Sequence, residues 1–347
     1  MIERPMLETR ALAIGYKRPR HPMRVVADEI NVTLLAGEFV CLLGPNGAGK
    51  STLIRTLAGM QAPLTGAVLI AGDPLATLSA CMLAKRMSLV LTQRVAVGMM
   101  PVVSFVALGR HPHTNWTGRL RREDEEVVWR AIADAGIMAL AHRPVCELSD
   151  GERQKVMIAR ALAQGPQVMI LDEATAFLDL PHRVGLMRLL RRLARESGLA
   201  ILLSTHDLDL ALRCADRLWL LPPGGPLRDG IPEDMVLQDV FATTFADAGI
   251  EFDKRSGSFI LGGEEHGVVS LYGDGVAAIW TCRALERAGY HVLPNGTAGI
   301  RVEVRLEGDG PVWRICDRDA EYSCASLEAM LSALRQQCAA RREGACR

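Results

Sequence analysis

The stretch GPNGAGKST, residues 44–52, follows an apolar run at residues 39–43 and precedes a segment with helical spacing. A strand, a glycine-rich loop and a helix in this order form a P-loop, in which backbone N–H groups and the helix N-terminus receive phosphates. Lys50 supplies a cation and Ser51 a hydroxyl ligand for magnesium. The sequence therefore predicts a nucleoside triphosphate site made by Gly44, Pro45, Asn46, Gly47, Ala48, Gly49, Lys50, Ser51 and Thr52.

The bulk composition predicts a soluble, cytoplasmic protein of two domains. The chain has 347 residues, more than a single hydrophobic core usually supports. Its 40 basic and 40 acidic residues balance, so we expect no nucleic-acid partner. No apolar run reaches the roughly 18 residues of a transmembrane helix, and the first residues lack the apolar centre of a signal peptide. If the protein works at a membrane, other chains must span it.

Strand-like apolar runs alternate with helical stretches, which predicts a mostly parallel sheet flanked by helices. The runs lie at residues 67–71, 87–91, 168–171, 200–204 and 217–221. Between them the sequence becomes helical and charged, and we expect a helical subdomain at about residues 95–165. A breaker cluster at residues 222–226 then predicts a domain boundary near residue 230. The expected domains are residues 1–230 and 231–347.

Polar residues follow two of the apolar runs. VMILDEA ends with Asp172 and Glu173, where one carboxylate can hold magnesium and a second can act on water. LLSTHD places His206 after another run, close to the γ-phosphate if that strand neighbours the P-loop strand. LSDGERQ, residues 148–154, opens a further helix.

Together these motifs resemble those of the ATP-binding-cassette (ABC) ATPases, in the family's order over about residues 7–230. The resemblance implies an α/β P-loop cassette with a mostly parallel sheet, a helical subdomain and ATP with Mg²⁺ as cofactors. It implies that Glu173 is the catalytic base and that His206 and Lys50 contact the γ-phosphate. Tyr16 matches the aromatic residue that stacks on adenine, and Gln93 matches the Q-loop. The implied magnesium ligands are Ser51, Gln93 and Asp172.

The same resemblance implies a head-to-tail homodimer that binds two ATP molecules at shared sites. Ser149 and the Gly151 backbone of one protomer would reach the γ-phosphate held by the other, and Asp179 would link the two sites. Closure on ATP and release after hydrolysis would form the working stroke. Asp150 stands where the family usually has glycine, and we expect its carboxylate to point away from the phosphates or to bind a cation.

The sequence around Gln93 and GRHPHTNW also resembles the cassettes of importers for ferric siderophores, haem and cobalamin. This resemblance implies a separate membrane permease, an indirect link to a substrate-binding protein and a peripheral position on the cytoplasmic face of the inner membrane. The implied transport is uptake of an iron complex or a corrinoid. Two alternatives stay open, a soluble ABC-type switch that needs no permease and an exporter cassette.

Residues 231–347 are predicted to form a small accessory α+β domain. Strands are expected at residues 268–272, 291–293, 300–306 and 312–316, with helices at residues 276–289 and 327–338. The turn GDGVAA has the outline of a dinucleotide fingerprint, but the unit is short and Asn295 stands where a ribose-binding acid belongs. We expect a plain turn there, and regulation or support of the dimer is the hypothesis for the domain.

Overall fold

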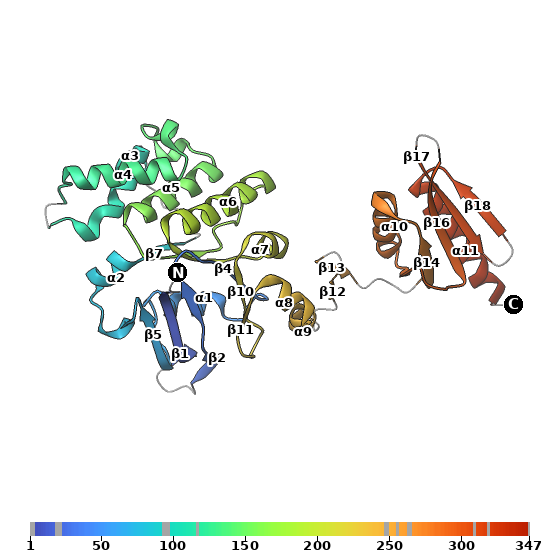
Figure 1. Ribbon diagram of the computed structural model, residues 1–347, viewed down its shortest axis with the longest axis horizontal. Helices are drawn as coiled ribbons and strands as arrows, with labels where there is room; N and C mark the ends of the chain where they lie inside the picture. The colour runs from blue at the N-terminus through green and yellow to red at the C-terminus, as the bar shows by residue number, and fades with distance from the viewer. Residues whose placement is uncertain are drawn as a thin grey trace. The chain divides into compact units, whose positions relative to one another are not determined.

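The computed structural model describes residues 4–17, 23–91, 98–115, 118–245, 250–254, 257–261, 266–307, 310–317 and 320–345. The chain divides into two compact units, drawn in Figure 1. The first is Met1–Thr244 with the short segment Ser256–Ser258, and the second is Phe245–Arg255 with Phe259–Arg347. Each unit is described by itself.

A largely parallel sheet forms the core of the first unit, in the strand order β11-β10-β4-β9-β8-β7. Strands β4 and β9 are buried along their whole length, as expected for parallel strands covered on both faces. Only the edge strand β11 among these runs antiparallel to its neighbour. The bounds are β4 (Phe39–Leu43), β7 (Met87–Val90), β8 (Val168–Asp172), β9 (Ala200–Ser204), β10 (Arg217–Leu220) and β11 (Arg228–Gly230).

A second, antiparallel sheet has the order β2-β1-β5-β6, with β3 paired to β1. The run at residues 67–71, which the sequence analysis placed in the parallel sheet, belongs to β5 of this sheet. A short apolar run carries no information on strand direction, which here is set by pairing with β1, Leu7 opposite Ile70. The bounds are β1 (Pro5–Tyr16), β2 (Arg24–Ile30), β3 (Thr33–Leu35), β5 (Thr65–Ile70) and β6 (Asp73–Pro74).

The helices of the first unit pack in two groups. Helices α3, α4 and α5 share a hydrophobic cluster of their own, centred on Phe105, Ile132 and Val156, and lie together on one side of the unit (Figure 1). The remaining helices of this unit lie beside the two sheets. The bounds are α1 (Lys50–Leu57), α2 (Ala80–Arg86), α3 (Val102–Ala107), α4 (Arg122–Asp134), α5 (Asp150–Ala163), α6 (Leu180–Ser197), α7 (Leu208–Cys214), α8 (Pro232–Leu237) and α9 (Val240–Phe245), with 3-10 segments at Leu75–Thr77, Leu108–His113, Met138–Leu140 and Val145–Glu147.

The second unit contains a sheet of order β15-β14-β16-β17-β18 and a separate pair, β12 with β13. Strand β14 runs parallel to β15, so the expected strand-helix-strand unit is confirmed. A Cβ at Gly273 would lie 2.7 Å from the Val304 carbonyl oxygen, so close packing accounts for that glycine. The bounds are β12 (Ile250–Asp253), β13 (Ser258–Leu261), β14 (Val268–Tyr272), α10 (Gly275–Arg287), β15 (His291–Pro294), β16 (Ile300–Glu307), β17 (Gly310–Asp317), β18 (Ala320–Cys324) and α11 (Leu327–Ala345).

In the part of the chain that the structure describes, no helix is both long enough and apolar enough to span a bilayer.

Candidate functional site

Three predicted motifs meet at one edge of the parallel sheet. Strand β4 runs into the P-loop, β8 ends at Asp172, and β9 ends two residues before His206. Because β9 lies between β4 and β8, its last residue Ser204 pairs with both Leu42 and Asp172. The expectation that the strand before His206 neighbours the P-loop strand is therefore confirmed. Ligands of open parallel sheets bind beyond such carboxyl ends.

The P-loop backbone has a conformation that only glycine adopts easily. Gly44, Gly47 and Gly49 have φ values of 152°, 81° and 108°. A Cβ at Gly44 would overlap the Leu221 carbonyl oxygen, and one at Gly49 would overlap the Val26 side chain. Gly49 also precedes α1 without a side-chain cap, so the first N–H groups of that helix are left for a ligand in the loop.

Lys50 is buried beneath the loop, with 6% of its surface exposed. Its Nζ donates to the carbonyl oxygens of Gly44, at 2.7 Å, and Pro45, at 3.1 Å. Burial lowers the pKa of Lys50, while the carboxylates of Glu173 and Asp172 act in the opposite direction. A buried ammonium group whose hydrogen bonds go to neutral carbonyl oxygens is stabilised when an anion binds next to it.

Tyr16 lies beside the first helix, at the end of β1. Its hydroxyl is 2.9 Å from Thr52 Oγ1 and accepts a hydrogen bond from Arg55 at 3.1 Å. The residue is 38% exposed. Ser51 is exposed on the first turn of α1. Gln93 lies outside the described residues.

The acidic pair is held by a serine that the sequence analysis did not single out. Ser204 Oγ donates to Asp172 Oδ1 at 2.8 Å, and the Glu173 N–H donates to the Ser204 carbonyl oxygen at 3.1 Å. Glu173 has a φ of 51°, which costs a non-glycine residue about 1–3 kcal/mol. Backbone strain such as that at Glu173 is concentrated at functional sites. The only sequence signal for Ser204 was that it is a polar residue at the end of an apolar run.

His206 Nε2 lies 2.9 Å from Glu173 Oε1. The two side chains border a cavity of about 450 Å³. Asp179, which is predicted to link the two ATP sites, lines the same cavity, so three of the predicted residues lie together. The full lining is Glu173, Thr175, Ala176, Phe177, Leu178, Asp179, Arg183, His206 and Asp207.

Ser149 caps helix α5 through a reciprocal pair of hydrogen bonds with Glu152. Glu152 N donates to Ser149 Oγ at 3.3 Å, and Ser149 N donates to Glu152 Oε2 at 2.9 Å. Hydrogen bonds from Ser149 N–H and then from its hydroxyl lower the pKa of Glu152. The S-x-x-E spacing is a capping box, a sequence signal that the analysis missed. Asp150 is exposed on the first turn of α5, where the helix dipole favours an acid, and the predicted direction of its carboxylate stays a prediction.

Asp179 caps α6, because its Oδ1 accepts the His182 backbone N–H at 3.1 Å. The His182 side chain hydrogen-bonds the same oxygen and is the main reason that the pKa of Asp179 is lowered. Arg183, the next residue, donates to the Leu178 carbonyl oxygen at 2.9 Å and pairs with Asp207 at 3.1 Å. The start of α6 is thus connected to the turn that carries His206.

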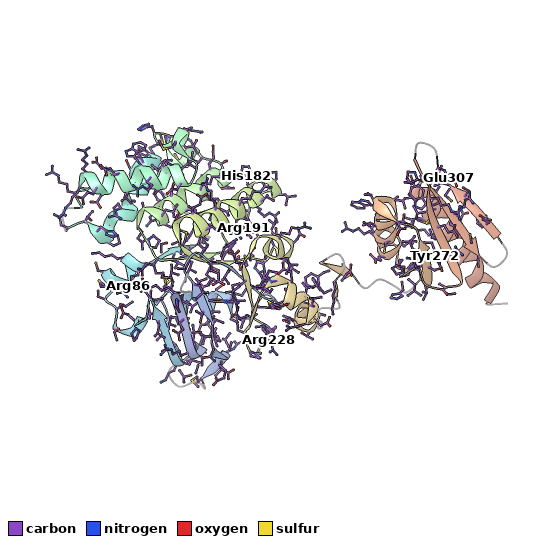
Figure 2. The ribbon with its side chains drawn as sticks, in the orientation of Figure 1. Arg86, His182, Arg191, Arg228, Tyr272 and Glu307 are labelled. Carbon is purple, nitrogen blue, oxygen red and sulfur yellow. The ribbon has the colours of Figure 1, made fainter. Side chains whose placement is uncertain are left out.

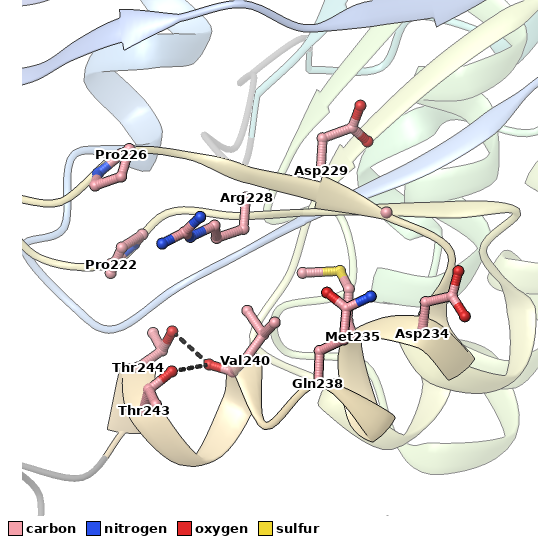
Figure 3. A pocket seen from close by; sticks show the side chains of 11 residues that line it. Pro222, Pro226, Arg228, Asp229, Asp234, Met235, Gln238, Val240, Thr243 and Thr244 are labelled. Carbon is pink, nitrogen blue, oxygen red and sulfur yellow. Dashed lines mark hydrogen bonds between the residues drawn. The ribbon is translucent and has the colours of Figure 1, made fainter.

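A second cavity, of about 660 Å³, lies between the β10–β11 turn and helices α8 and α9 (Figure 3). Thr243 and Thr244 line it, but both hydroxyls donate to the Val240 carbonyl oxygen, at 3.0 and 2.8 Å. Asp229 pairs with Arg217 at 2.7 Å. These three polar groups serve the fold, and none of the predicted site residues that the structure describes lines this cavity.

The P-loop, the acidic pair and the histidine at adjacent strand ends define a P-loop ATPase of the ATP-binding-cassette class. A family model described as ABC transporter matches residues 27–176, and a model described as Iron ABC transporter C-terminal domain matches residues 266–335. The relatives below agree with the first of these matches. The chain belongs to the family of ABC transporter ATP-binding proteins, and it binds ATP and hydrolyses it in connection with transport.

An uncharacterized ABC transporter ATP-binding protein of Methanocaldococcus jannaschii is 43% identical over 235 residues, covering 68% of this chain and 79% of the relative. The iron(3+)-hydroxamate import ATP-binding protein of Bacillus subtilis is 36% identical, covering 72% and 91%. The cobalamin import ATP-binding protein of Halobacterium salinarum is 35% identical, covering 82% and 71%. Among solved structures, a dimeric bacterial ABC transporter cassette is 26% identical with a TM-score of 0.56, covering 65% and 99%.

Proposed function

We propose that the chain is the ATP-hydrolysing subunit of an importer that takes up an iron complex, such as a siderophore or haem, or a cobalamin-like corrinoid. The observation that carries the catalytic part is the 2.9 Å contact between His206 and Glu173 at strand ends beside the P-loop. The import direction and the cargo class are supported by the iron-import and cobalamin-import relatives and by the match to the iron transporter C-terminal domain.

Residues 44–52 wrap the phosphates. Backbone N–H groups of the glycine turns point toward the triphosphate, and Lys50 exchanges its two carbonyl partners for the β- and γ-phosphate oxygens. Tyr16 stacks on the adenine, with its hydroxyl anchored to Thr52. The buried ammonium gains a counter-charge, which raises its pKa again.

The residues proposed as ligands fit a magnesium ion, because Ser51 and Asp172 at this edge offer the oxygen donors that Mg²⁺ prefers. Gln93, which lies outside the described residues, would add an amide oxygen. Asp172 is oriented for this task by the Ser204 hydroxyl. Magnesium bound there would neutralise charge on the β- and γ-phosphates. Ser51 and Asp172 would hold it from the P-loop and the β8 end, respectively.

Glu173 orients the attacking water and accepts its proton. The two hydrogen bonds from its backbone N–H to Ser204 hold the strained Glu173 backbone at the strand end, where it places the carboxylate. His206 leaves Glu173 to contact the γ-phosphate, where its N–H stabilises the charge of the transferring group. The acid and the histidine thus exchange a contact with each other for contacts with the reactants.

Two copies of the chain form a head-to-tail homodimer with two composite sites. Ser149 and Gly151 of one protomer complete the site that holds ATP in the other, and Asp179 connects the sites. The dimer works peripherally on the cytoplasmic face of the inner membrane beneath integral permease subunits, and indirectly with a substrate-binding protein. A dimeric cassette among the similar solved structures supports this assembly.

The decisive experiment replaces Glu173 with Gln. The substitution keeps the side-chain size and a hydrogen-bond acceptor for His206 but removes the base. We expect ATP hydrolysis to fall by about 10²–10⁴-fold and ATP to trap the variant as a dimer on size-exclusion chromatography. Glu196→Gln, an exposed residue near the end of α6, is the matched control and keeps wild-type turnover and elution.

Full hydrolysis by the Glu173→Gln variant, or a variant that stays monomeric at saturating Mg·ATP, would overturn the composite-site proposal. The cargo is tested separately. Cells with and without the chain are compared for uptake of ferric siderophores, of haem and of cobalamin, and unchanged uptake of all of them would refute the importer assignment.

A further inference from the structure

His182 lies between Asp179 and the start of α5, which carries Ser149 and Gly151. The proposed function assigns these residues to the composite sites that hold ATP in the dimer. His182 is the third residue of helix α6, and its position on that helix is marked in Figure 2. On one side its Nδ1 contacts Asp179 Oδ1. An ionised carboxylate is only an acceptor, so Nδ1 carries the proton and donates to Asp179.

On its other side the His182 ring covers the backbone of Gly151. A Cβ built at Gly151 would lie 2.9 Å from Cγ of His182, closer than real side chains approach, and 3.1 Å from Nε2, tighter than most real contacts. Gly151 belongs to the first turn of α5, and its own φ is unexceptional for an L-residue. Any larger residue at this position would therefore force the His182 ring of the same protomer to move.

We infer that His182 is a positioning residue that joins Asp179 to the start of α5, so that Asp179, Ser149 and Gly151 are presented to the partner's ATP as one unit. The inference rests on the proposed function, because it needs a composite site. Within one protomer, His182 takes no part in the hydrogen bonds that Lys50 makes to the P-loop carbonyl oxygens. Its loss should weaken closure of the dimer and leave ATP binding by a single protomer intact.

The test uses the full chain with Glu173→Gln, which accumulates the ATP-bound dimer, and adds either His182→Leu or His182→Asn. Leucine keeps bulk against Gly151 without a donor, whereas the Asn amide places a donor close to the position of Nδ1. ATP affinity is measured at protein concentrations where the chain is monomeric, and the dimer dissociation constant is measured at saturating Mg·ATP by analytical ultracentrifugation.

We expect His182→Leu to raise the dimer dissociation constant about tenfold, because a hydrogen bond to a charged group is lost. The monomer's ATP affinity and thermal unfolding should stay within about twofold and about 2 °C of the parent, and His182→Asn should restore most of the dimer. His291→Leu, at an exposed histidine of the other unit, is the matched control.

Two results would overturn the inference in distinguishable ways. If Glu173→Gln alone fails to dimerise with ATP, the proposed composite site fails and the role of His182 fails with it. If that parent dimerises but His182→Leu leaves the dimer constant unchanged, or lowers monomer ATP affinity to the same extent, only the positioning role of His182 is wrong.

Discussion

His206 Nε2 and Glu173 Oε1 lie 2.9 Å apart on loops that leave two adjacent parallel strands. Neither side chain is deeply buried, so the contact depends on the backbone that holds it. The Glu173 N–H is bonded to Ser204, and Ser204 is fully buried at the end of β9. Sheet registry thus sets the distance between the acid and the histidine before any nucleotide binds.

Replacing His206 with Ala should lower the turnover number about 10²-fold, because a donor to the γ-phosphate and a partner of Glu173 are lost. ATP affinity should change little, since the P-loop and Lys50 supply the phosphate contacts. Phosphate release and nucleotide binding measured on the same preparation check this. His206→Gln, which keeps a donor, should be less impaired. Equal turnover in His206→Ala and the wild type would remove His206 from the catalytic machinery.

Gly151→Ala should lower ATPase turnover at least tenfold, because its Cβ would overlap the His182 ring and shift the start of α5. Gly185→Ala is the matched control on α6, where a Cβ meets nothing within 4 Å. That control should keep its activity and gain about 0.5–1 kcal/mol in the free energy of unfolding. Steady-state hydrolysis and urea unfolding measure both effects. An active Gly151→Ala variant would show that the ring yields without cost.

Much of the catalytic edge could be predicted from the sequence, because each motif is local. The P-loop, the acids after the apolar run at residues 168–171 and His206 each sit within a few residues of a strand end. Strand order could not be read from the sequence, since β9 inserts between β4 and β8 by long-range pairing. The contact of His182 with Gly151 was hidden for the same reason.

The mostly parallel sheet was predicted correctly, but the sequence did not show that β5 belongs to a separate antiparallel sheet, because an apolar run does not show its partner. Helices α8 and α9 were not predicted as part of the first unit, since the breaker cluster at residues 222–226 led to an expected boundary near residue 230. The roles of individual site residues, including the adenine contact of Tyr16 and the magnesium ligands, stay predictions.

Lys50→Met should abolish ATP binding and stabilise the nucleotide-free chain by about 1 kcal/mol at pH 7, because a buried cation is removed. Burial lowers the pKa of Lys50 in the folded chain below 10.5, its ordinary value in the unfolded chain. At a pH between the folded-state and unfolded-state values, the unfolded chain therefore binds more protons than the folded chain. The free energy of unfolding of the wild type therefore rises with pH through that window. The difference in free energy of unfolding between the Lys50→Met variant and the wild type becomes smaller. Urea unfolding at pH 7 and pH 10, with and without Mg·ATP, checks the sign. A variant that is less stable than wild type at pH 7 would contradict it.

A truncation after residue 244 should leave ATP hydrolysis by the cassette intact, whereas one after residue 230 should destabilise the cassette. Phe241 is fully buried and Met235 is 3% exposed, so α8 and α9 belong to the packed first unit. Losing one such aromatic side chain costs about 3–5 kcal/mol. Urea unfolding and ATPase assays of the two truncated chains, with the full chain as control, give the comparison.

If the chain ending at 244 is active but no longer assembles as a dimer, the second unit supports the dimer, whereas a change in turnover alone would assign it to regulation. Equal stability of the two truncated chains would show that α8 and α9 are dispensable for the cassette.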